Sequence, residues 1–317
     1  MLCSSVELLA LTKVSEFDAG VSALRQVLSC NLHRYSPSKL SVLNSSLPKE
    51  IRVHEAVPVA PSFDAWDWAS HRHYSYLMPT YAFASLELSL NEASSFRISK
   101  EHLWFVRKMA LDFIGGRNFI NFTDKKRLAK EFRSRKSFES FCYRYIFDGK
   151  VDDPFVYKGV EFCTVHFKGN SFILHQIRKM ISVLILLSRG IMTREFLLRN
   201  LFREVSVSIP LSPGFPLVLS NLSYDQYNRI QMLKNEGVMT QLNFYKHDKT
   251  IRKFAKDLIF TEILDEHVNG SQMLEFSNFV LLTSESCLEN CKKYRSWKNV
   301  LIFDAPRPIS ENLLASV

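Results

Sequence analysis

The chain has 317 residues, of which 46% are hydrophobic and 13% aromatic. This composition indicates a folded protein with a sizeable core and excludes a disordered chain. Lys and Arg outnumber Asp and Glu by 41 to 32, a net charge of +9, which favours a polyanionic partner, although many basic proteins have none. The longest apolar run, 180–187, is too short to cross a bilayer, so no membrane partner is expected.

The elements expected in chain order mix strands and helices without a regular alternation. Strands are expected at 27–32, within 47–59, at 63–80, 140–147 and 160–167, and helices at 99–116, 171–190 and 194–205. The residues after Tyr224 carry more charge and are expected to form a mostly helical extension. This order predicts an α+β fold with a largely antiparallel sheet.

The stretch SEFDAGVSA, residues 15–23, places Asp18 against a glycine turn ahead of the first expected strand. An aspartate in a turn usually does no more than accept hydrogen bonds from nearby backbone N–H groups. A catalytic role for Asp18 would therefore require a partner elsewhere in the chain.

The helix expected at 171–190 is apolar on nearly every side and nevertheless contains Arg178. A buried guanidinium stays protonated and is costly without an acidic acceptor, so we expect a carboxylate from another part of the fold to pair with it. The alternative is that Arg178 extends to the surface beside Lys179.

Arg72, Tyr74 and Tyr76 alternate along one expected strand, so their side chains share one face of it. A cation beside two aromatic rings on a sheet is typical of surfaces that stack unpaired RNA bases, but the same residues are common in ordinary sheets. A second basic feature is the segment 124–136, with seven Lys and Arg, including Lys125 and Lys126, against two acids. Such a run is either a solvated face or a grip on phosphates.

Several common catalytic motifs are missing from the sequence. It contains no glycine-rich phosphate loop, no dinucleotide-binding fingerprint, no HExxH metal motif and no nucleophile elbow. These absences argue against a P-loop NTPase, a nicotinamide-dependent dehydrogenase, a zinc protease of this type and an α/β-hydrolase.

Five segments resemble, in the right order, the TruA family of tRNA pseudouridine synthases, in particular its eukaryotic multisite branch. They read FDAGVSALRQV, LNSSLPKEIRV, RHYSYLMPT, GGRNFINFT and GNSFILHQIRKMIS. The matches run from Asp18 to about Tyr227. Each segment alone is modest evidence, whereas five in order are strong.

The resemblance implies a pseudouridine synthase fold: two ferredoxin-like halves that share a central, mainly antiparallel sheet with a basic cleft across it. It divides the chain into an N-terminal catalytic half at 1–78, shorter than in the family, a C-terminal catalytic half at 79–227, and a mostly helical extension at 228–317.

The resemblance also implies an activity, the isomerisation of uridine to pseudouridine in tRNA without cofactor or metal. Asp18 would be the catalytic residue, Tyr74 would stack on the target base, and Arg178 would pair with Asp18. The RNA-binding residues expected on this basis are Arg72, Arg117, Lys125, Lys126 and Lys179. Other structured RNA is a further candidate substrate, the protein is expected to be a monomer or homodimer, and the nucleus is the expected location, with the cytoplasm or mitochondrion as alternatives.

The sequence departs from the family pattern at Trp66, where the family has arginine, at Ser182, where it commonly has glycine, and in two further features near Asp18. Glu16 and Phe17 stand where the family has Arg-Thr, and only 17 residues precede Asp18, where the family has a strand and a long helix. Either the sequence starts late, or the protein has eroded, or the sheet closes in another way. These departures leave a second function open, a catalytically inactive relative that binds RNA with the same fold.

Overall fold

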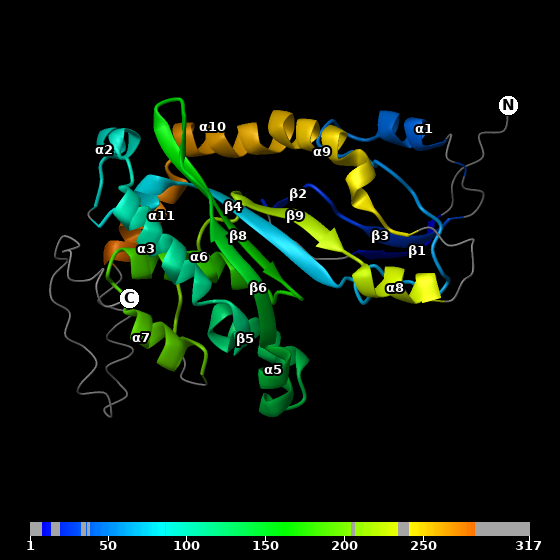
Figure 1. Cartoon of the computed structure of the whole chain (residues 1–317), viewed down its shortest axis with the longest axis horizontal. Coiled ribbons are helices and arrows are strands. Elements are labelled where there is room, and N and C mark those ends of the chain that lie inside the picture. Colours follow the sequence, from blue (N-terminus) through cyan, green and yellow to red (C-terminus); the bar gives the residue numbers. More distant parts are fainter. Residues whose placement is uncertain are drawn as a thin grey trace.

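The computed structural model describes residues 8–13, 20–32, 36, 39–85, 87–203, 207–233 and 241–282. These residues form a mixed α/β structure around one central sheet (Figure 1). Asp18, Glu16 and Phe17 lie outside the described residues.

The central sheet has the strand order β2-β9-β4-β8-β6-β5, and β7 pairs with β8 beside this path. Antiparallel pairing dominates, as predicted, and the short contact between β2 and β9 is parallel. Its strands are β2 (Ser22–Ala23), β4 (His71–Pro79), β5 (Gly115–Asn118), β6 (Tyr143–Val151), β7 (Phe155–Tyr157), β8 (Val160–Gly169) and β9 (Leu217–Ser223). A separate antiparallel pair joins β1 (Leu8–Lys13) to β3 (Leu28–Leu32), and β3 confirms the strand predicted at 27–32.

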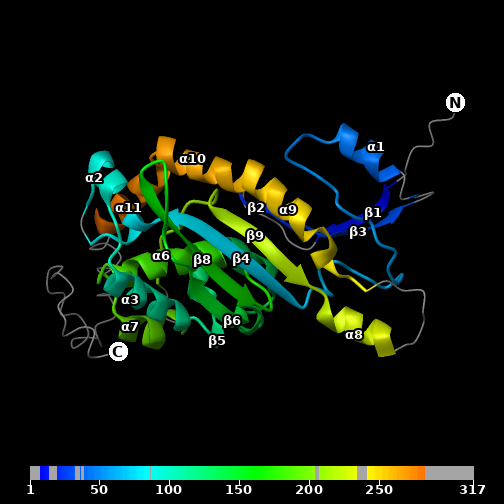
Figure 2. The same cartoon turned by 45° about the horizontal axis from the view of Figure 1, so that its top comes forward.

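The helices surround this sheet. They are α1 (Lys39–Ser46), α2 (Leu90–Ser95), α3 (Lys100–Leu111), α4 (Lys125–Leu128), α5 (Arg135–Phe141), α6 (Gln176–Ser188), α7 (Arg194–Phe196), α8 (Asp225–Leu233), α9 (Asp248–Phe254), α10 (Thr261–Asn269) and α11 (Gln272–Leu282). α3 packs against both α6 and β6, and α9 and α10 run beside β9 and β4 in both views (Figures 1 and 2). None of the described helices is long and apolar enough to cross a membrane.

Strand β4 is the centre of the sheet because it pairs with β8 on one side and β9 on the other. Tyr76 and Met78 are fully buried, and the strand ends at Pro79, close to the predicted end, but begins at His71 and not at 63 as predicted. Arg72 and Tyr74 precede Tyr76 on the same face and are also buried. The three residues therefore share one face, as predicted, but that face is covered and is not an open platform.

Helix α6 is almost entirely buried, as its apolar sequence predicts, but it is shorter than expected. It begins after His175, which adopts a left-handed backbone conformation with φ of 68°, and ends before Gly190, whose φ is 71°. Arg178 consequently lies in the first turn and is half-buried, whereas the sequence predicted a place in the middle of the helix. The first turn is where a charged side chain can leave the apolar interior.

One predicted strand is absent, and another begins later than predicted. The strand expected within 47–59 is absent, because the side chain of Asn44 accepts from Val53 N and donates to Val53 O, both at 2.8 Å, in place of a neighbouring strand. The strand expected at 140–147 begins only at Tyr143, since Ser134 caps α5 through the backbone N–H of Ser137 and the helix continues to Phe141.

Two other segments were predicted correctly in type, and one of them is shorter than expected. Ser99 caps α3 as expected, through His102 N at 3.1 Å, but α3 ends at Leu111 and the glycine pair 115–116 opens β5. Strand β8 confirms the strand predicted at 160–167, which was expected to run into Gly169 and ends there. The described residues after Tyr224 are helical, in agreement with the sequence.

Helix α10 docks on the sheet through His267, which is buried. Its Nε2 donates to the carbonyl oxygen of Leu77 in β4 at 3.0 Å, and its ring lies 4.7 Å from that of Phe215 and 5.8 Å from that of Phe162. Nδ1 is buried without a partner among the described residues. Burial lowers the pKa of His267 to about 4, so the imidazole is neutral when the protein is folded at neutral pH.

Acidification is therefore expected to destabilise the fold through His267. Because the pKa is about 4 in the folded state against 6.5 for an exposed histidine, the stabilisation is fully present above pH 6.5 and is lost as the pH falls from 6.5 towards 4. The expected loss of unfolding free energy between pH 7 and pH 5 is about 2 kcal/mol. Urea unfolding at both pH values measures it, and His267→Gln, which cannot titrate there, should lose less over the same interval. An equal loss in both proteins would contradict the assignment.

Candidate active site

The turn that follows Asp18 is held against the loop before β9. Gly20 has φ of 84°, a conformation that glycine adopts without strain, and a Cβ at this position would lie 3.6 Å from the backbone nitrogen of Phe215. Ser22 and Ala23 then enter the sheet beside Val218 and Leu219. The chain next to Asp18 is thus fixed to the segment 212–215, which we call the 212–215 loop.

Arg178 is fixed to the same loop by a reciprocal pair of hydrogen bonds. Its Nε donates to the carbonyl oxygen of Ser212 at 2.6 Å, and Ser212 Oγ donates to the carbonyl oxygen of Arg178 at 2.8 Å. Ser212 is fully buried, so both bonds are protected from water. The bond through Nε fixes the plane in which the terminal nitrogens of the guanidinium lie.

The two tyrosines of β4 contact the elements around this loop. Tyr76 donates its hydroxyl to the carbonyl oxygen of Pro213 at 2.9 Å, and burial raises the pKa of Tyr76, which stays neutral. Tyr74 meets Phe172 edge to face, with ring centroids 5.3 Å apart. Phe172 belongs to the short segment that leads into α6, so Tyr74 lies between the central strand and the start of the helix that carries Arg178.

The first turn of α6 carries two cations, Arg178 and Lys179, and no acidic residue. The ammonium of Lys179 donates to the carbonyl oxygen of Thr123 at 2.7 Å, and burial together with nearby Lys125 lowers the pKa of Lys179 to about 8. Cations at a helix N-terminus oppose the helix dipole by about 0.3–1 kcal/mol each. The arrangement therefore favours an anion at this end of α6.

The predicted RNA-binding residues are divided between the interior and the surface. Arg72 is buried, donating to the carbonyl oxygens of Asn170 at 3.1 Å and Trp66 at 3.3 Å, and Lys125 donates to the side-chain oxygen of Asn121 at 2.5 Å. These two cations donate hydrogen bonds to backbone and amide oxygens inside the fold.

Arg117 and Lys126 complete the predicted set. The guanidinium of Arg117 lies 4.8 Å from the ring centre of Phe202, and Lys126 is exposed at the start of α4. Arg144 of β6 lies directly opposite Arg117 of β5 in the strand register. Arg144 was not identified from the sequence as a candidate RNA-binding residue. It has no motif around it, and only the register of β5 and β6 reveals its position.

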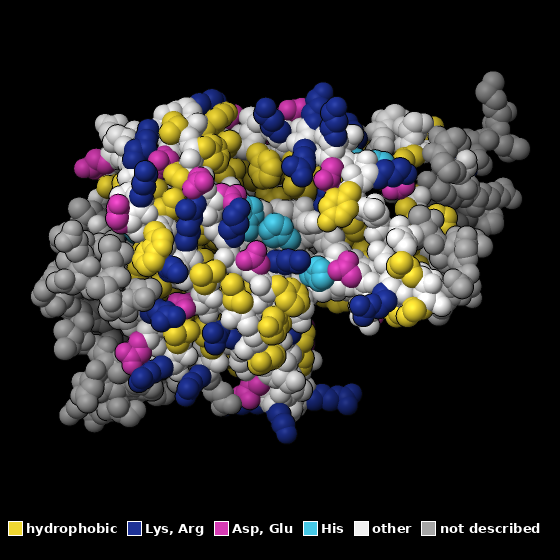
Figure 3. Space-filling view, in the orientation of Figure 1, with side chains coloured by type: hydrophobic (Ala, Val, Ile, Leu, Met, Phe, Trp, Pro, Cys, Tyr) yellow, Lys and Arg dark blue, Asp and Glu magenta, His cyan; other side chains and the backbone are white. Residues whose placement is uncertain are grey.

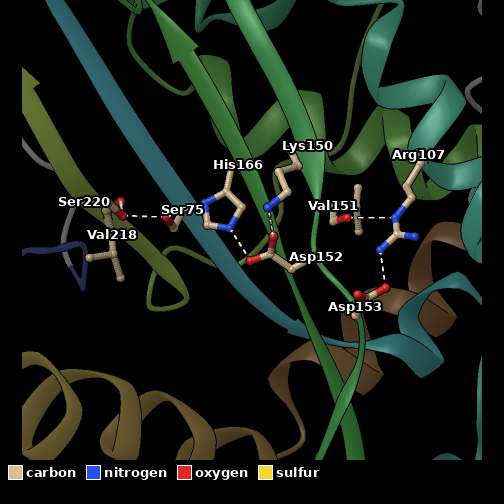
Figure 4. A network of polar contacts seen from close by, with 9 residues as sticks. All are labelled: Ser75, Arg107, Lys150, Val151, Asp152, Asp153, His166, Val218 and Ser220. Atoms are coloured by element: carbon tan, nitrogen blue, oxygen red, sulfur yellow. Dashed lines mark hydrogen bonds and ion pairs between the residues drawn. The ribbon is translucent and has the colours of Figure 1, made fainter. Parts of the chain in front are cut away.

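A polar network that the sequence did not indicate joins four segments across the sheet (Figure 4). In β8, the Nδ1 atom of His166 is 2.9 Å from Ser75 Oγ, and its Nε2 atom is 2.8 Å from Asp152 Oδ2. Ser75 Oγ also contacts Ser220 Oγ at 2.5 Å, and Lys150 pairs with Asp152 at 2.6 Å. Serine, histidine and aspartate also form the catalytic triad of many hydrolases. Here Ser75 is buried and its hydroxyl oxygen is also in contact with Ser220, which argues against a nucleophile. The network therefore links the strands of the sheet.

Potential metal ligands do not gather in the described part of the chain. There, no group of three or more His, Cys, Asp and Glu side chains is placed to hold a metal ion. The nearest pair of histidines is His73 and His166, with ring centroids 5.3 Å apart, and burial with the proximity of His166 lowers the pKa of His73 to about 4.

Comparison with known proteins agrees with the resemblance seen in the sequence. The family model described as tRNA pseudouridine synthase matches residues 109–225, a range that contains Arg178 but not Asp18 or Tyr74. The protein named Pseudouridylate synthase 1 homolog is 30% identical over 261 residues in Mus musculus, covering 82% of this chain and 58% of that protein. In Homo sapiens the protein of that name is 31% identical over 259 residues, covering 82% and 57%.

A fungal relative gives a shorter match. tRNA pseudouridine synthase 1 of Candida albicans is 31% identical over 186 residues, covering 59% of this chain and 28% of that protein. The chain thus spans less than two-thirds of the length of these curated relatives. The predicted family resemblance is confirmed: most of the chain is similar to proteins named as pseudouridine synthases in eukaryotes, and residues 109–225 match the tRNA pseudouridine synthase family model.

Proposed function

We propose that the protein is a tRNA pseudouridine synthase, which isomerises uridine to pseudouridine in tRNA with Asp18 as the catalytic residue. The observation that carries the proposal is the 212–215 loop. Its Ser212 accepts a hydrogen bond from Arg178, its Pro213 accepts one from Tyr76, and its Phe215 lies close to Gly20, two residues after Asp18.

This loop supports a pairing of Asp18 with Arg178. Three residues span at most about 11 Å, so the contacts at Ser212 and Phe215 bring both chain segments to one short stretch of backbone. The N-terminal end of α6 favours an anion, and the carboxylate of Asp18 is an acid that the chain can supply there. Arg178 would then hold the carboxylate ionised and in a fixed direction.

The target nucleotide must leave its stack to reach Asp18, which costs a few kcal/mol. Stacking of the flipped uracil on Tyr74 would return part of that free energy, and because Tyr74 is only 8% exposed it would require Phe172, which packs on its ring, to move aside. Lys125, Lys126, Lys179, Arg72 and Arg117 would supply a positive field for the phosphates around the target.

The reaction requires one bond to break and another to form. Asp18 acts as a nucleophile or a base on the nucleoside, and the N-glycosidic bond between N1 of uracil and C1′ of the ribose breaks. The uracil turns within the pocket, and its C5 bonds to C1′. C5 then loses its proton and N1 gains one, so the product is an isomer of the substrate.

The finer architecture is proposed from the same resemblance. Two ferredoxin-like halves, at 1–78 and 79–227, would share the central sheet, with 228–317 as an extension. Residues 248–269 would stabilise the position of the 212–215 loop, because the ring of His267 in α10 packs against the ring of Phe215. We further propose that the protein acts in the nucleus as a monomer or homodimer. Its main substrate would be tRNA, and other structured RNA would be a second substrate.

The test is conversion of an unmodified tRNA transcript by the purified chain. We expect pseudouridine to appear, detected as the derivatised nucleoside by mass spectrometry, and to require neither an added metal nor a cofactor. Binding of the transcript without conversion would select the alternative function, an inactive relative that only binds RNA. That alternative rests on Glu16, an acidic residue where the family carries arginine.

A further inference from the structure

Four aromatic side chains follow one another on the exposed side of β6 and the residues just before it. We call Phe141, Tyr143, Tyr145 and Phe147 the aromatic strip. Tyr143, Tyr145 and Phe147 are 56%, 47% and 43% exposed, and the rings of Tyr145 and Phe147 lie 5.2 Å apart. Hydrophobic side chains gather over this part of the sheet in the space-filling view (Figure 3).

The local backbone explains why these rings face outward. Ile146 and Gly149 are buried on the side of β6 that packs on α3, where a Cβ on Gly149 would lie 2.7 Å from the Ala110 carbonyl oxygen. A register shift between Ile146 and Asp148 keeps Phe147 on the opposite side, next to Asp148. Large exposed rings in a row are costly to leave in water, which marks the strip as an interaction surface.

The charges around the strip indicate a polyanionic partner. Nine Lys and Arg stand against four Asp and Glu between 124 and 150, the segment that leads into and contains the strip. The guanidinium of Arg144 lies 4.5 Å from the ring centre of Phe141, and His71 meets Phe147 edge to face at 5.7 Å. A guanidinium beside a row of exposed rings suits nucleotides, whose bases stack while their phosphates pair with the cation.

One residue connects the strip to the strand of the candidate active site. Asn170 donates its backbone N–H to the Tyr145 carbonyl oxygen and accepts from Tyr145 N, both at 3.0 Å. Its own carbonyl oxygen accepts from Arg72, two residues before Tyr74. Tyr145 and Phe147 are exposed, whereas Ile146 and Gly149 are buried towards α3, so we infer that the two rings lie on the side of the sheet opposite to α3 and would meet a part of the RNA other than the target nucleotide.

We propose that the aromatic strip is a stacking platform for unpaired bases of the RNA substrate, outside the nucleotide that is isomerised. The inference depends on the proposed function for the identity of the RNA, but binding to the strip can be measured without catalysis.

The test compares RNA affinity in the double variant Tyr145→Ala/Phe147→Ala with that of the wild type. Because stacking contributes about 1–3 kcal/mol per base, we expect the affinity for a single-stranded oligouridylate and for an unmodified tRNA transcript to fall at least about tenfold. Affinity for a fully paired RNA duplex should not change. The slope of log affinity against log salt should also stay the same, since no phosphate contact is removed.

Matched variants separate stacking from general effects. Tyr145→Phe keeps the ring and should bind like the wild type, whereas Tyr145→Leu keeps apolar area without a ring and should bind more weakly. Trp104→Ala removes an exposed ring beside Lys108 on α3 and should leave affinity unchanged. Circular dichroism of each variant reports whether the fold is intact.

Unchanged affinity of the double variant, or an equal loss for duplex and single strand, would overturn the proposal. A change of the double variant from dimer to monomer in light scattering, without loss of RNA affinity, would instead make the strip a contact between copies of this chain. If the wild type binds the transcript but does not convert it, the proposed function fails, while the comparison of the variants still tests the strip.

Discussion

Replacement of Asp18 by asparagine is expected to reduce pseudouridine formation by at least about 10³-fold while leaving tRNA affinity within about threefold of the wild type. Asparagine has the shape of aspartate, but its neutral amide neither attacks the nucleoside nor accepts its proton. Affinity should persist because a carboxylate contributes nothing favourable to phosphate binding. Tritium release from tRNA labelled at C5 of uridine measures the rate in single turnovers, and fluorescence anisotropy measures the affinity.

Asp153→Asn is the matched control for this experiment. Asp153 is a highly exposed carboxylate that pairs with Arg107 at 2.7 Å, away from the 212–215 loop, and its loss should leave the rate within twofold. A rate for Asp18→Asn within tenfold of the wild type would exclude Asp18 as the catalytic residue. Loss of affinity together with rate would place Asp18 in binding or folding instead.

The sequence predicts the centre of the fold well because that centre is encoded locally. Strand β8 and the end of β4 at Pro79 follow from apolar runs and a proline, and the start of α3 follows from the Ser99 cap. The interior of α6 follows from its continuous apolar residues. In each case a short segment contains the whole physical reason for its structure.

The errors occur where a distant or side-chain partner replaces the local pattern. Asn44 occupies both backbone groups of Val53, so a segment with strand composition forms no strand. The left-handed His175 delays α6 by five residues from the expected start at 171, and no propensity scale places a histidine there. Both features depend on the three-dimensional surroundings of the residue, which a local sequence pattern does not contain.

The candidate site shows the same division. Arg178 and Tyr74 were recognised from the motifs around them, whereas Ser212, which binds Arg178, follows it by 34 residues without a motif. The network of Ser75, Asp152, His166 and Ser220 likewise brings together residues from separate segments, and only the register of β4 on β8 aligns Ser75 with His166.

Replacement of Arg178 by alanine is expected to lower the rate of pseudouridine formation by about 10²–10³-fold, the usual effect of losing a preorganised charged donor. The variant removes the proposed partner of Asp18 and leaves the Ser212 carbonyl oxygen without its Nε donor. Arg178→Lys restores the charge but has neither the Nε–H group nor the planar fork, so it should recover less than a tenth of the lost rate. Arg199→Ala, an exposed arginine on the surface turn after α7, should have no effect.

Ser212→Ala separates the charge of Arg178 from its orientation. The substitution removes the hydroxyl that donates to the Arg178 carbonyl oxygen but keeps the backbone carbonyl that accepts from Nε. We therefore expect a rate loss of no more than about tenfold, because one buried hydrogen bond contributes roughly 0.5–1.5 kcal/mol. A loss as large as that of Arg178→Ala would mean that the loop, and not the guanidinium, carries the effect. If Arg178→Ala formed pseudouridine as fast as the wild type, the proposed pairing of Asp18 with Arg178 would be wrong, because the pairing is the only proposed reason for Asp18 to depend on this arginine.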